Sequence, residues 1–197
     1  MCSSDLALLE VGDRVRFVPG DRKGLTKGLT KAPPPRIDAE ETREGGSIVV
    51  RAAGGGLSVQ DGGRLGWRRA GVGPGGVADR LAFDVASILV GNAPSAAALE
   101  WAAIGPRLEF ARGAWVALAG APFDARVIVP GHDEVTLPWL HAAWVPAGAT
   151  LAVGSTVAPA RQGMLRGLRG CLAVAGGIDV ADILGSRSTD VRSGFGG

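Results

Sequence analysis

Residues 98–120 read ALEWAAIGPRLEFARGAWVALAG, and this stretch decides the class of fold. Three short apolar runs, 98–103, 107–111 and 114–120, are separated by Gly-Pro and Arg-Gly breaks. Short runs rich in Val, Leu, Ile and aromatic residues between such breaks are typical of β-strands that are buried on at least one face. The stretch therefore predicts three consecutive strands.

The same pattern extends through most of the chain. Further apolar runs lie at 47–53, 57–60, 125–129, 143–145, 150–154 and 169–175. The 32 glycines and 12 prolines among 197 residues suit many tight turns. The sequence thus predicts a mostly-β fold, in a barrel or a sandwich.

One segment has its apolar residues at the spacing of a helix and not of a strand. In 79–90, DRLAFDVASILV, the apolar residues recur at helical spacing, Asp79 stands where an N-cap is favoured, and Gly91-Asn92 supplies a stop. We expect one clear helix here. A second, short helical turn is predicted at 179–184, opened by Asp179.

The first part of the chain divides into two segments. Residues 8–19 predict a turn at Gly12-Asp13 and a strand with no local partner. Residues 20–46 hold a repeated KGLT tetrad, three prolines and a charged stretch, which cannot bury enough apolar surface to fold and which we interpret as a flexible linker. The globular part runs over 47–197.

Composition excludes several classes of protein. The net charge is only +2, and no cluster interleaves basic and aromatic residues, so no nucleic-acid partner is expected. No window of about 18 apolar residues predicts a membrane span, and the stretch MCSSDLALLEVGD has no basic n-region and too short an apolar run for a signal peptide, so we expect a cytoplasmic location. Cys2 and Cys171 are expected to be reduced thiols, and no His/Cys cluster suggests a metal.

Two glycine-rich segments carry the candidate chemistry. Residues 59–79, VQDGGRLGWRRAGVGPGGVAD, connect a strand to the helix, and backbone N–H groups at the helix start could hold an anion. The alternative is a long irregular hairpin with solvated arginines. The segment is not a phosphate-binding P-loop, because no Gly-Lys-Ser/Thr follows.

The second segment is 176–190, GGIDVADILGSRSTD, where hydroxyls flank Arg187. A guanidinium in this setting suits a carboxylate, although a turn capped by its own hydroxyls is an equal alternative. Glu100 stands in an apolar strand, either as a buried acid–base group or as an outward-facing residue.

These segments together resemble a known family. GLSVQDGGRLGWRRAGVGPGGVADRLAFDVASILVGN, AALEWAAIGPRLEF and RGCLAVAGGIDVADILGSRSTDVRSGFGG occur in the order typical of the KipA family, also called the C subunit of 5-oxoprolinase, allophanate hydrolase subunit 2 or the biotin-dependent carboxyltransferase family. The resemblance implies an incomplete cyclophilin-like β-barrel. It also implies a role in the ATP-dependent opening of 5-oxo-L-proline to L-glutamate.

The resemblance also implies site residues at the matching positions. Asp79, Glu100 and Arg187 are the catalytic candidates. The substrate-binding candidates are Gln60, Asp61, Arg64, Gly75, Gly76, Ser186, Ser188 and Thr189. The chain departs from the family pattern at 75–79, where Gly-Gly-Val-Ala-Asp replaces Ser-Gly-Ala-Met-Asp, and at 119–122, where Ala-Gly-Ala-Pro replaces Thr-Gly-Ala-Asp.

The resemblance sets further expectations for domains and partners. LLEVGDRVRFVP is similar to the C-terminal end of the KipI family, the B-type component of 5-oxoprolinase, so 1–19 would be a KipI-type remnant and 47–197 the N-terminal portion of a KipA-type domain. The A-type and B-type components of 5-oxoprolinase would be its partners. ATP would be used by the complex, and biotin would be a possible cofactor because urea carboxylase is related. No metal is implied. The alternatives are a non-catalytic KipI/KipA-type regulatory module and a truncated, inactive fragment.

Overall fold

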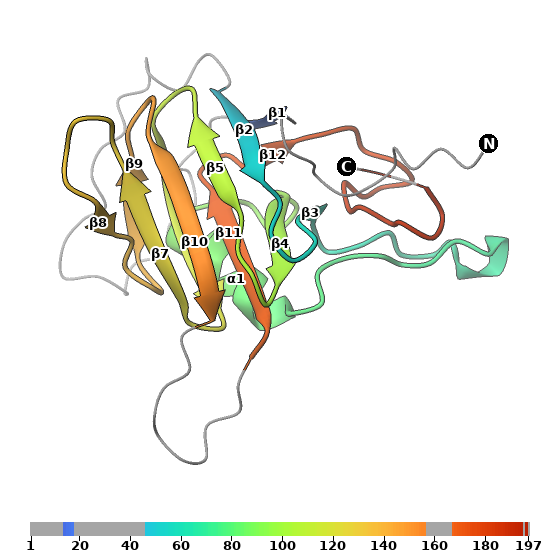
Figure 1. Cartoon of the computed structure of the whole chain (residues 1–197). Helices are drawn as coiled ribbons and strands as arrows, with labels where there is room; N and C mark the ends of the chain where they lie inside the picture. Colours follow the sequence, from blue (N-terminus) through green and yellow to red (C-terminus); the bar gives the residue numbers. More distant parts are fainter. Residues whose placement is uncertain (1–13, 18–45, 157–166, 195, 197) are drawn as a thin grey trace, which may run out of the picture.

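The computed structural model describes residues 14–17, 46–156, 167–194 and 196. Two antiparallel sheets face each other, and one α-helix lies against the outer side of the smaller sheet (Figure 1). The mostly-β prediction is confirmed. In the described part of the chain no helix is long and apolar enough to span a membrane.

The larger sheet has seven strands in the order β12-β1-β2-β5-β10-β7-β8. Their bounds are β1 Arg14–Phe17, β2 Gly46–Ala52, β5 Arg107–Phe110, β7 Phe123–Ile128, β8 Val135–Thr136, β10 Thr150–Thr156 and β12 Ile178–Asp179. The smaller sheet has five strands in the order β3-β4-β11-β6-β9. Their bounds are β3 Ser58–Gln60, β4 Ala98–Ala102, β6 Ala114–Gly120, β9 Ala142–Val145 and β11 Arg169–Val174.

The main core fills the space between the two sheets. Trp101, Phe110 and Leu172 are among its fully buried side chains. In β7 buried and exposed residues alternate, because one face meets the core and the other meets solvent. In β6 nearly every residue is buried, because the helix covers the face that points away from the core.

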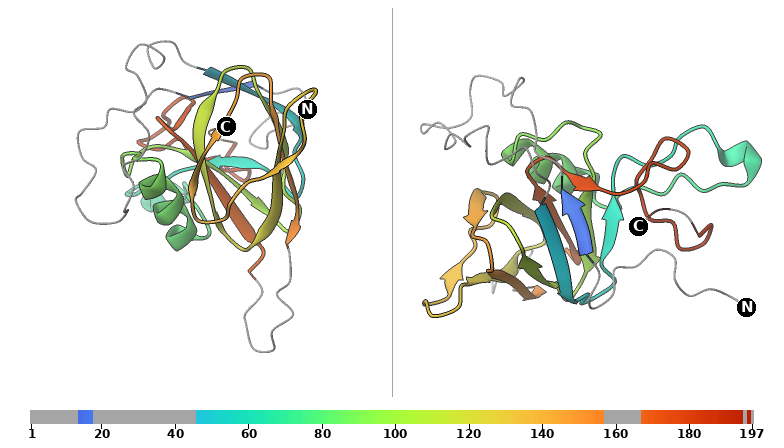
Figure 2. Two further views of the ribbon diagram at one scale, coloured as in Figure 1. Left: turned by 90° about the vertical axis from the view of Figure 1, so that its left-hand side faces the viewer. Right: turned by 90° about the horizontal axis from the view of Figure 1, so that it is seen from above.

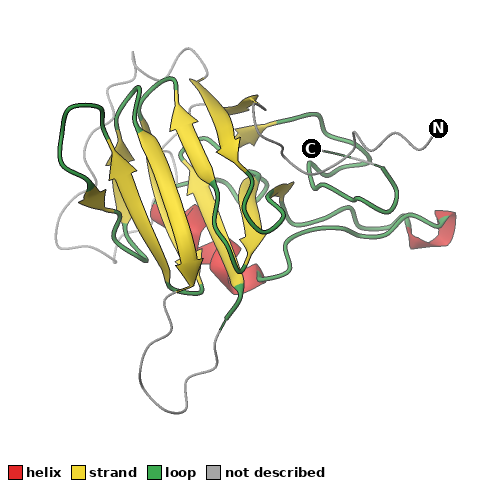
Figure 3. Cartoon of the chain, in the orientation of Figure 1, coloured by secondary structure: helices red, strands yellow, loops and turns green. Residues whose placement is uncertain are grey.

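The helix α1, Arg80–Leu89, confirms the helical spacing of the sequence. Its buried residues Ala82, Phe83 and Ala86 pack on the outer face of β6 and β11, in a second, smaller core with Cys171 and Ala119. Figure 3 shows this helix behind the strands. Ala119, one of the departures from the family pattern, thus packs among these apolar residues.

The barrel that the family resemblance implies is not closed. Among the described residues, the two sheets are joined only by the isolated bridges Ala97–Ile178 and Ile104–Ser155, with no continuous ladder of backbone hydrogen bonds between them. The architecture is therefore two packed sheets with open edges.

The strand expected in 8–19 is present as β1, and its two partners are distant in the sequence, as the lack of a local partner predicts. It pairs antiparallel with β2, with Arg14 opposite Val49, and with β12, with Arg16 opposite Asp179. The assignment of 1–19 to a KipI-type domain stays a prediction. The linker expected at 20–46 lies outside the described residues, except for Gly46, which begins β2.

The helical turn expected at 179–184 is wrong. Asp179 ends β12, and the chain then forms a tight turn in which Ile183 and Ser186 exchange backbone hydrogen bonds. Leu184 and Gly185 stand at the corner with positive φ of 57° and 82°, which helical geometry does not allow.

Candidate functional site

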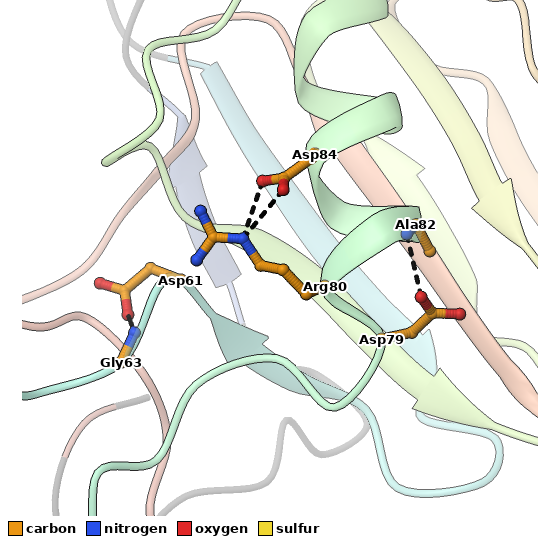
Figure 4. Close-up of polar contacts among 6 residues, drawn as sticks. All are labelled: Asp61, Gly63, Asp79, Arg80, Ala82 and Asp84. Atoms are coloured by element: carbon orange, nitrogen blue, oxygen red, sulfur yellow. Dashed lines mark hydrogen bonds and ion pairs between the residues drawn. The ribbon is translucent and has the colours of Figure 1, made fainter.

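The two glycine-rich segments of the sequence meet at one end of the molecule. After β3 the chain runs outward to a 3-10 turn, η1 Arg68–Ala70, and returns to α1, while the segment 183–190 lies beside its base (Figures 1 and 2). The contact between them is made by buried polar residues. Figure 4 shows part of this region together with the start of α1.

Asp61 is the centre of this contact. Its carboxylate Oδ1 accepts hydrogen bonds from the Ser186 hydroxyl at 2.6 Å, the Ser188 hydroxyl at 2.5 Å and the Gly63 N–H at 2.8 Å. Oδ2 accepts from the Arg187 backbone N–H at 2.7 Å. The Asp61 N–H in turn donates to Ser188 Oγ at 2.9 Å. One carboxylate therefore fixes both segments.

The charge of Asp61 is stabilised in this position. The side chain is only 6% exposed, and burial alone would raise its pKa. The hydrogen bonds from Ser186, Ser188 and the backbone of Arg187 and Gly63 outweigh that effect and lower the pKa below its ordinary value. Asp61 is therefore an ionised anchor and not a proton donor at neutral pH.

Arg64 is also built into the structure. It is 1% exposed, and its guanidinium donates to the backbone carbonyls of Ser188, at 2.6 Å, and Ile183, at 3.3 Å. Gly75 lies directly against it, because a Cβ on that glycine would stand 3.1 Å from Arg64 Nη1. Gly76 is in similar contact with the backbone of Gly63, so both glycines are needed for close approach of the two chain segments.

The guanidinium of Arg187 is placed differently. Arg187 is half-exposed, and its backbone N–H is fixed on Asp61. Its guanidinium has no hydrogen bond or ion pair with any residue that the structure describes. A fixed backbone with a free guanidinium is an arrangement that can bind an anion from outside.

Gln60 and Thr189 lie next to this group and are buried. The Gln60 amide nitrogen donates to Ser58 Oγ at 3.1 Å and to the Thr189 carbonyl at 3.2 Å. Gln60 Oε1 and Thr189 Oγ1 have no hydrogen-bond partner among the described residues. Buried polar atoms normally have partners, so these two atoms are exceptions within the described residues.

Glu100 and Asp79 form a second group, at the start of α1. Glu100 is 3% exposed, so it is not an outward-facing residue; its Oε1 accepts from the N–H of Ala78, at 2.9 Å, and of Asp79, at 3.1 Å. Its other oxygen lies 3.6 Å from the Arg169 guanidinium. The Asp79 carboxylate accepts from the Ala82 N–H at 3.0 Å, which confirms the predicted N-cap (Figure 4).

These contacts occupy several of the backbone donors that were expected to form an anion site at the helix start. The N–H groups of Ala78, Asp79 and Ala82 are already bonded to carboxylates of the chain itself, and the Val77 N–H donates to the Asp61 carbonyl. A phosphate of ATP bound there would lie beside two carboxylates, those of Asp79 and Glu100, which would repel it. The described residues therefore do not fit ATP at this position.

The sequence did not indicate Arg169, the partner of Glu100. Its position at the start of β11 could have suggested this role, because β11 pairs with β4 and sets Arg169 opposite Ala102, two residues from Glu100. Cys171, also opposite Glu100 in this ladder, is buried. Burial and the neighbouring charges of Glu100 and Asp79 raise the pKa of its thiol, so it is not a nucleophile.

The departure at 119–122 does not touch the contact around Asp61. Pro122 is half-buried at the turn between β6 and β7, while Ala119 lies against Ala82 at the start of α1, near the second candidate group. The catalytic and substrate-binding roles of the sequence-predicted residues stay predictions. The structure brings Gln60, Asp61, Arg64, Gly75, Gly76, Ser186, Arg187, Ser188 and Thr189 together, and it sets Asp79 and Glu100 in the neighbouring group.

Several known proteins are similar to this chain. The C subunit of 5-oxoprolinase from Escherichia coli strain K12 is 39% identical over 150 residues, which are 76% of this chain and 44% of that protein. The urea amidolyase of Saccharomyces cerevisiae is 32% identical over 152 residues, 77% of this chain and 8% of that enzyme. The chain thus spans less than half the length of these relatives.

Solved structures agree with the sequence comparisons. The crystal structure of TTHA0988 superposes with a TM-score of 0.66 at 34% identity, over 87% of this chain and 32% of that chain. The urea amidolyase of K. lactis superposes with a TM-score of 0.63 at 34% identity, over 72% of this chain and 8% of that chain. Residues 70–197 match the family model described as the carboxyltransferase domain, subdomains A and B, and the chain belongs to this family.

Proposed function

We propose that the chain is a component of an ATP-dependent 5-oxoprolinase complex, in which it binds 5-oxo-L-proline and acts with components of types A and B. The E. coli relative, named as the C subunit of 5-oxoprolinase, supports this assignment. The urea amidolyase relatives make urea or a related amide the alternative substrate.

The observation that carries the proposal is the free guanidinium of Arg187 on a backbone fixed by Asp61. The substrate 5-oxoproline has a carboxylate and a lactam. A guanidinium binds a carboxylate through two parallel hydrogen bonds. Gln60 Oε1 and Thr189 Oγ1 have no partner among the described residues but are buried, so a lactam would reach them only after a local movement of these segments; Gln60 Oε1 would then accept the lactam N–H, and the Thr189 hydroxyl would donate to the lactam carbonyl.

The remaining candidate residues hold the side chains of Arg187, Gln60 and Thr189 in place. Asp61, with Ser186 and Ser188, fixes the segment that carries Arg187 and Thr189. Glu100 fixes the loop that leads into α1. Asp79 and Glu100 are retained as candidates for moving a proton in the complete complex, although each carboxylate already bonds backbone N–H groups.

ATP and biotin are assigned to the complex and not to this site. The N–H groups at the start of α1 are occupied by carboxylates, so a phosphate does not fit there. For biotin, the unpartnered pair at Gln60 and Thr189 suits a ureido group as well as a lactam. If bound, biotin would supply carboxyl transfer, with these two residues holding its ring.

The test is Arg187→Ala in the reconstituted complex, with 5-oxo-L-proline and ATP and with glutamate release as the readout. We expect kcat/KM to fall by about 100-fold or more, since two charge-assisted hydrogen bonds are lost. The Arg187 backbone N–H stays on Asp61 in this variant, so the fold should be unchanged. Arg192→Ala, an exposed arginine of the same region, is the matched control.

Arg187→Lys separates charge from geometry. A lysine keeps the charge but not the planar pair of donors, so we expect an intermediate loss. Wild-type kinetics of Arg187→Ala in a complex that turns over 5-oxoproline would refute the proposed site. A wild-type complex that shows no turnover of 5-oxoproline would refute the proposed function itself.

A further inference from the structure

The carboxylate of Glu100 has its two oxygens in different surroundings. Oε1 accepts hydrogen bonds from the backbone N–H groups of Ala78, at 2.9 Å, and Asp79, at 3.1 Å. Oε2 makes no hydrogen bond with the residues that the structure describes, and its ion-pair partner there, the Arg169 guanidinium, is 3.6 Å away. This separation is too long for a hydrogen bond, so the lone pairs of Oε2 can still accept a proton.

Oε2 is also open to solvent, although the side chain of Glu100 as a whole is buried. It is not one of the described side-chain atoms that are fully buried without a partner, a group to which Gln60 Oε1 belongs. The guanidinium beside it is carried by a side chain that is 48% exposed. The side of Oε2 that faces Arg169 is therefore the side from which a water molecule can reach it.

The backbone of Arg169 is held firmly in place. In the ladder of β11 with β4, Arg169 lies opposite Ala102, and its carbonyl accepts from the Ala121 N–H at 2.7 Å. Gly120 approaches the same carbonyl so closely that a Cβ on this glycine would clash with it. Arg169 thus carries a positive charge from a fixed position in the sheet to one particular oxygen of a buried carboxylate.

The carboxylate of Asp79 lacks such a partner. Its Oδ1 accepts from the Ala82 N–H at 3.0 Å as the N-cap of α1 (Figure 4), and it makes no ion pair with the residues that the structure describes. The last torsion of a carboxylate side chain has broad minima, so hydrogen bonds to one oxygen leave the other free to swing. Of the two carboxylates proposed to move a proton, only that of Glu100 has a cation that limits this motion.

We infer that Arg169 is a positioning residue, which keeps Oε2 of Glu100 turned toward the open side as the proton acceptor of the reaction. This inference rests on the proposed function, because it takes 5-oxoprolinase turnover as the reaction. The proton comes from the water that adds to the lactam carbonyl. One O–H bond of this water breaks and an O–H bond forms on Oε2, while the electron pair left on the water oxygen bonds the carbonyl carbon and the carbonyl π pair moves to its oxygen.

The experiment measures kcat and KM separately for the reconstituted complex, with 5-oxo-L-proline and ATP and with glutamate release as the readout. Arg169→Ala should lower kcat by about 30-fold, because the proton acceptor is no longer oriented, and should leave KM within about twofold of wild type. Arg169→Lys keeps the charge and should recover most of this loss. A wild-type kcat for Arg169→Ala, or a loss that appears only in KM, would overturn the inference.

A matched control is available on the other sheet. Arg126 has a side chain that is 51% exposed, and it pairs with the exposed carboxylates of Asp124, at 3.2 Å, and Glu134, at 3.4 Å. Arg126→Ala removes an equally exposed arginine from an ion pair that has no buried carboxylate. We expect this variant to keep the wild-type kcat and KM.

Glu100→Gln shows whether Arg169 acts through Glu100. The amide oxygen of this variant can still accept from the N–H groups of Ala78 and Asp79, while Oε2 is lost. Adding Arg169→Ala to Glu100→Gln should then lower kcat no further, since contacting residues of one unit are not additive. A further loss of 10-fold or so would contradict the inference. This comparison also serves if Arg169→Ala alone does not fold, because the double variant leaves no buried charge unpaired.

The outcomes separate the inference from the function on which it rests. If the wild-type complex turns over 5-oxoproline while Arg169→Ala, shown by circular dichroism to be folded, keeps the wild-type kcat, Arg169 is not a positioning residue, although the function stands. If the wild-type complex does not turn over 5-oxoproline, the proposed function fails and the inference fails with it.

Discussion

Replacement of Asp61 by Asn is the sharpest test of the anchor described above. The variant keeps the shape of the side chain but removes its charge and turns one acceptor into a donor. The N–H of Arg187 and the donors at Ser186, Ser188 and Gly63 all require acceptors, so whichever way the amide is turned at least one donor meets another donor.

The magnitude follows from the number and kind of these bonds. A hydrogen bond to a charged group contributes about 1.5–3 kcal/mol and a neutral one about 1 kcal/mol. Loss of one bond and weakening of three therefore costs about 5 kcal/mol, of which about 2 kcal/mol is recovered because a buried amide is easier to desolvate than a carboxylate. We expect Asp61→Asn to lower the free energy of unfolding by about 3 kcal/mol.

The assay is urea unfolding at neutral pH, followed by tryptophan fluorescence and circular dichroism. Asp190→Asn is the control, because Asp190 also accepts backbone hydrogen bonds, from Arg192 and Ser193, but is only half-buried. We expect the control to lose about 1 kcal/mol or less. A free energy of unfolding for Asp61→Asn within about 0.5 kcal/mol of wild type would refute the account of Asp61 as an anchor.

The pH dependence supplies a second readout of the same group. Because the folded state lowers the pKa of Asp61, its ionised form stabilises the fold above the unfolded pKa of about 4, and this contribution is lost as the pH falls through the folded value. The difference in stability between wild type and Asp61→Asn should therefore be full at neutral pH and should shrink below about pH 4. A difference that is constant from neutral to acid pH would contradict the ionised state.

Two further predictions concern the packed interior. In a Cys2→Ser variant, the buried Cys171 thiol, whose pKa is raised, should react with a thiol reagent at about pH 8 far more slowly in the native chain than in guanidinium chloride, and equal rates would show that the site is open. Gly170→Ala should destabilise the chain by about 2–4 kcal/mol in urea unfolding, because the new Cβ would stand 2.5 Å from Trp101 and 2.7 Å from Phe123; a loss below about 0.5 kcal/mol would show that these rings can move aside.

The elements of the fold follow well from the apolar pattern, because each long strand buries a run of Val, Leu, Ile and Ala. The helix was predictable for the same reason, together with its cap at Asp79. The two-residue strands β8 and β12 were not predictable. A segment of two residues has no hydrophobic period, and it becomes a strand only because it pairs with a longer neighbouring strand. The turn after β12 was mistaken for a helix because Asp179 has the residue type of a cap but lies at a strand end.

The sequence indicated candidate residues, and their functional roles stay predictions; it did not indicate how these residues connect. Asp61 and Ser188 are 127 positions apart, and nothing local in either segment shows that one will bond the other. The same limit applies to Glu100, where the sequence left a buried and an outward-facing role open. The pairing of β4 with β3 and β11 decides between these two roles, because it turns the Glu100 carboxylate toward the start of α1.

The position of β1 has a consequence for how the chain folds. This strand lies between β2, which follows soon after it, and β12, which is made only when nearly the whole described chain has been synthesised. One edge of β1 can therefore pair early during synthesis, while the other edge must wait for Ile178 and Asp179. Since contacts so distant in sequence slow folding, the β1–β12 ladder should be among the last to form, and a nascent chain would carry an unpaired strand edge until then.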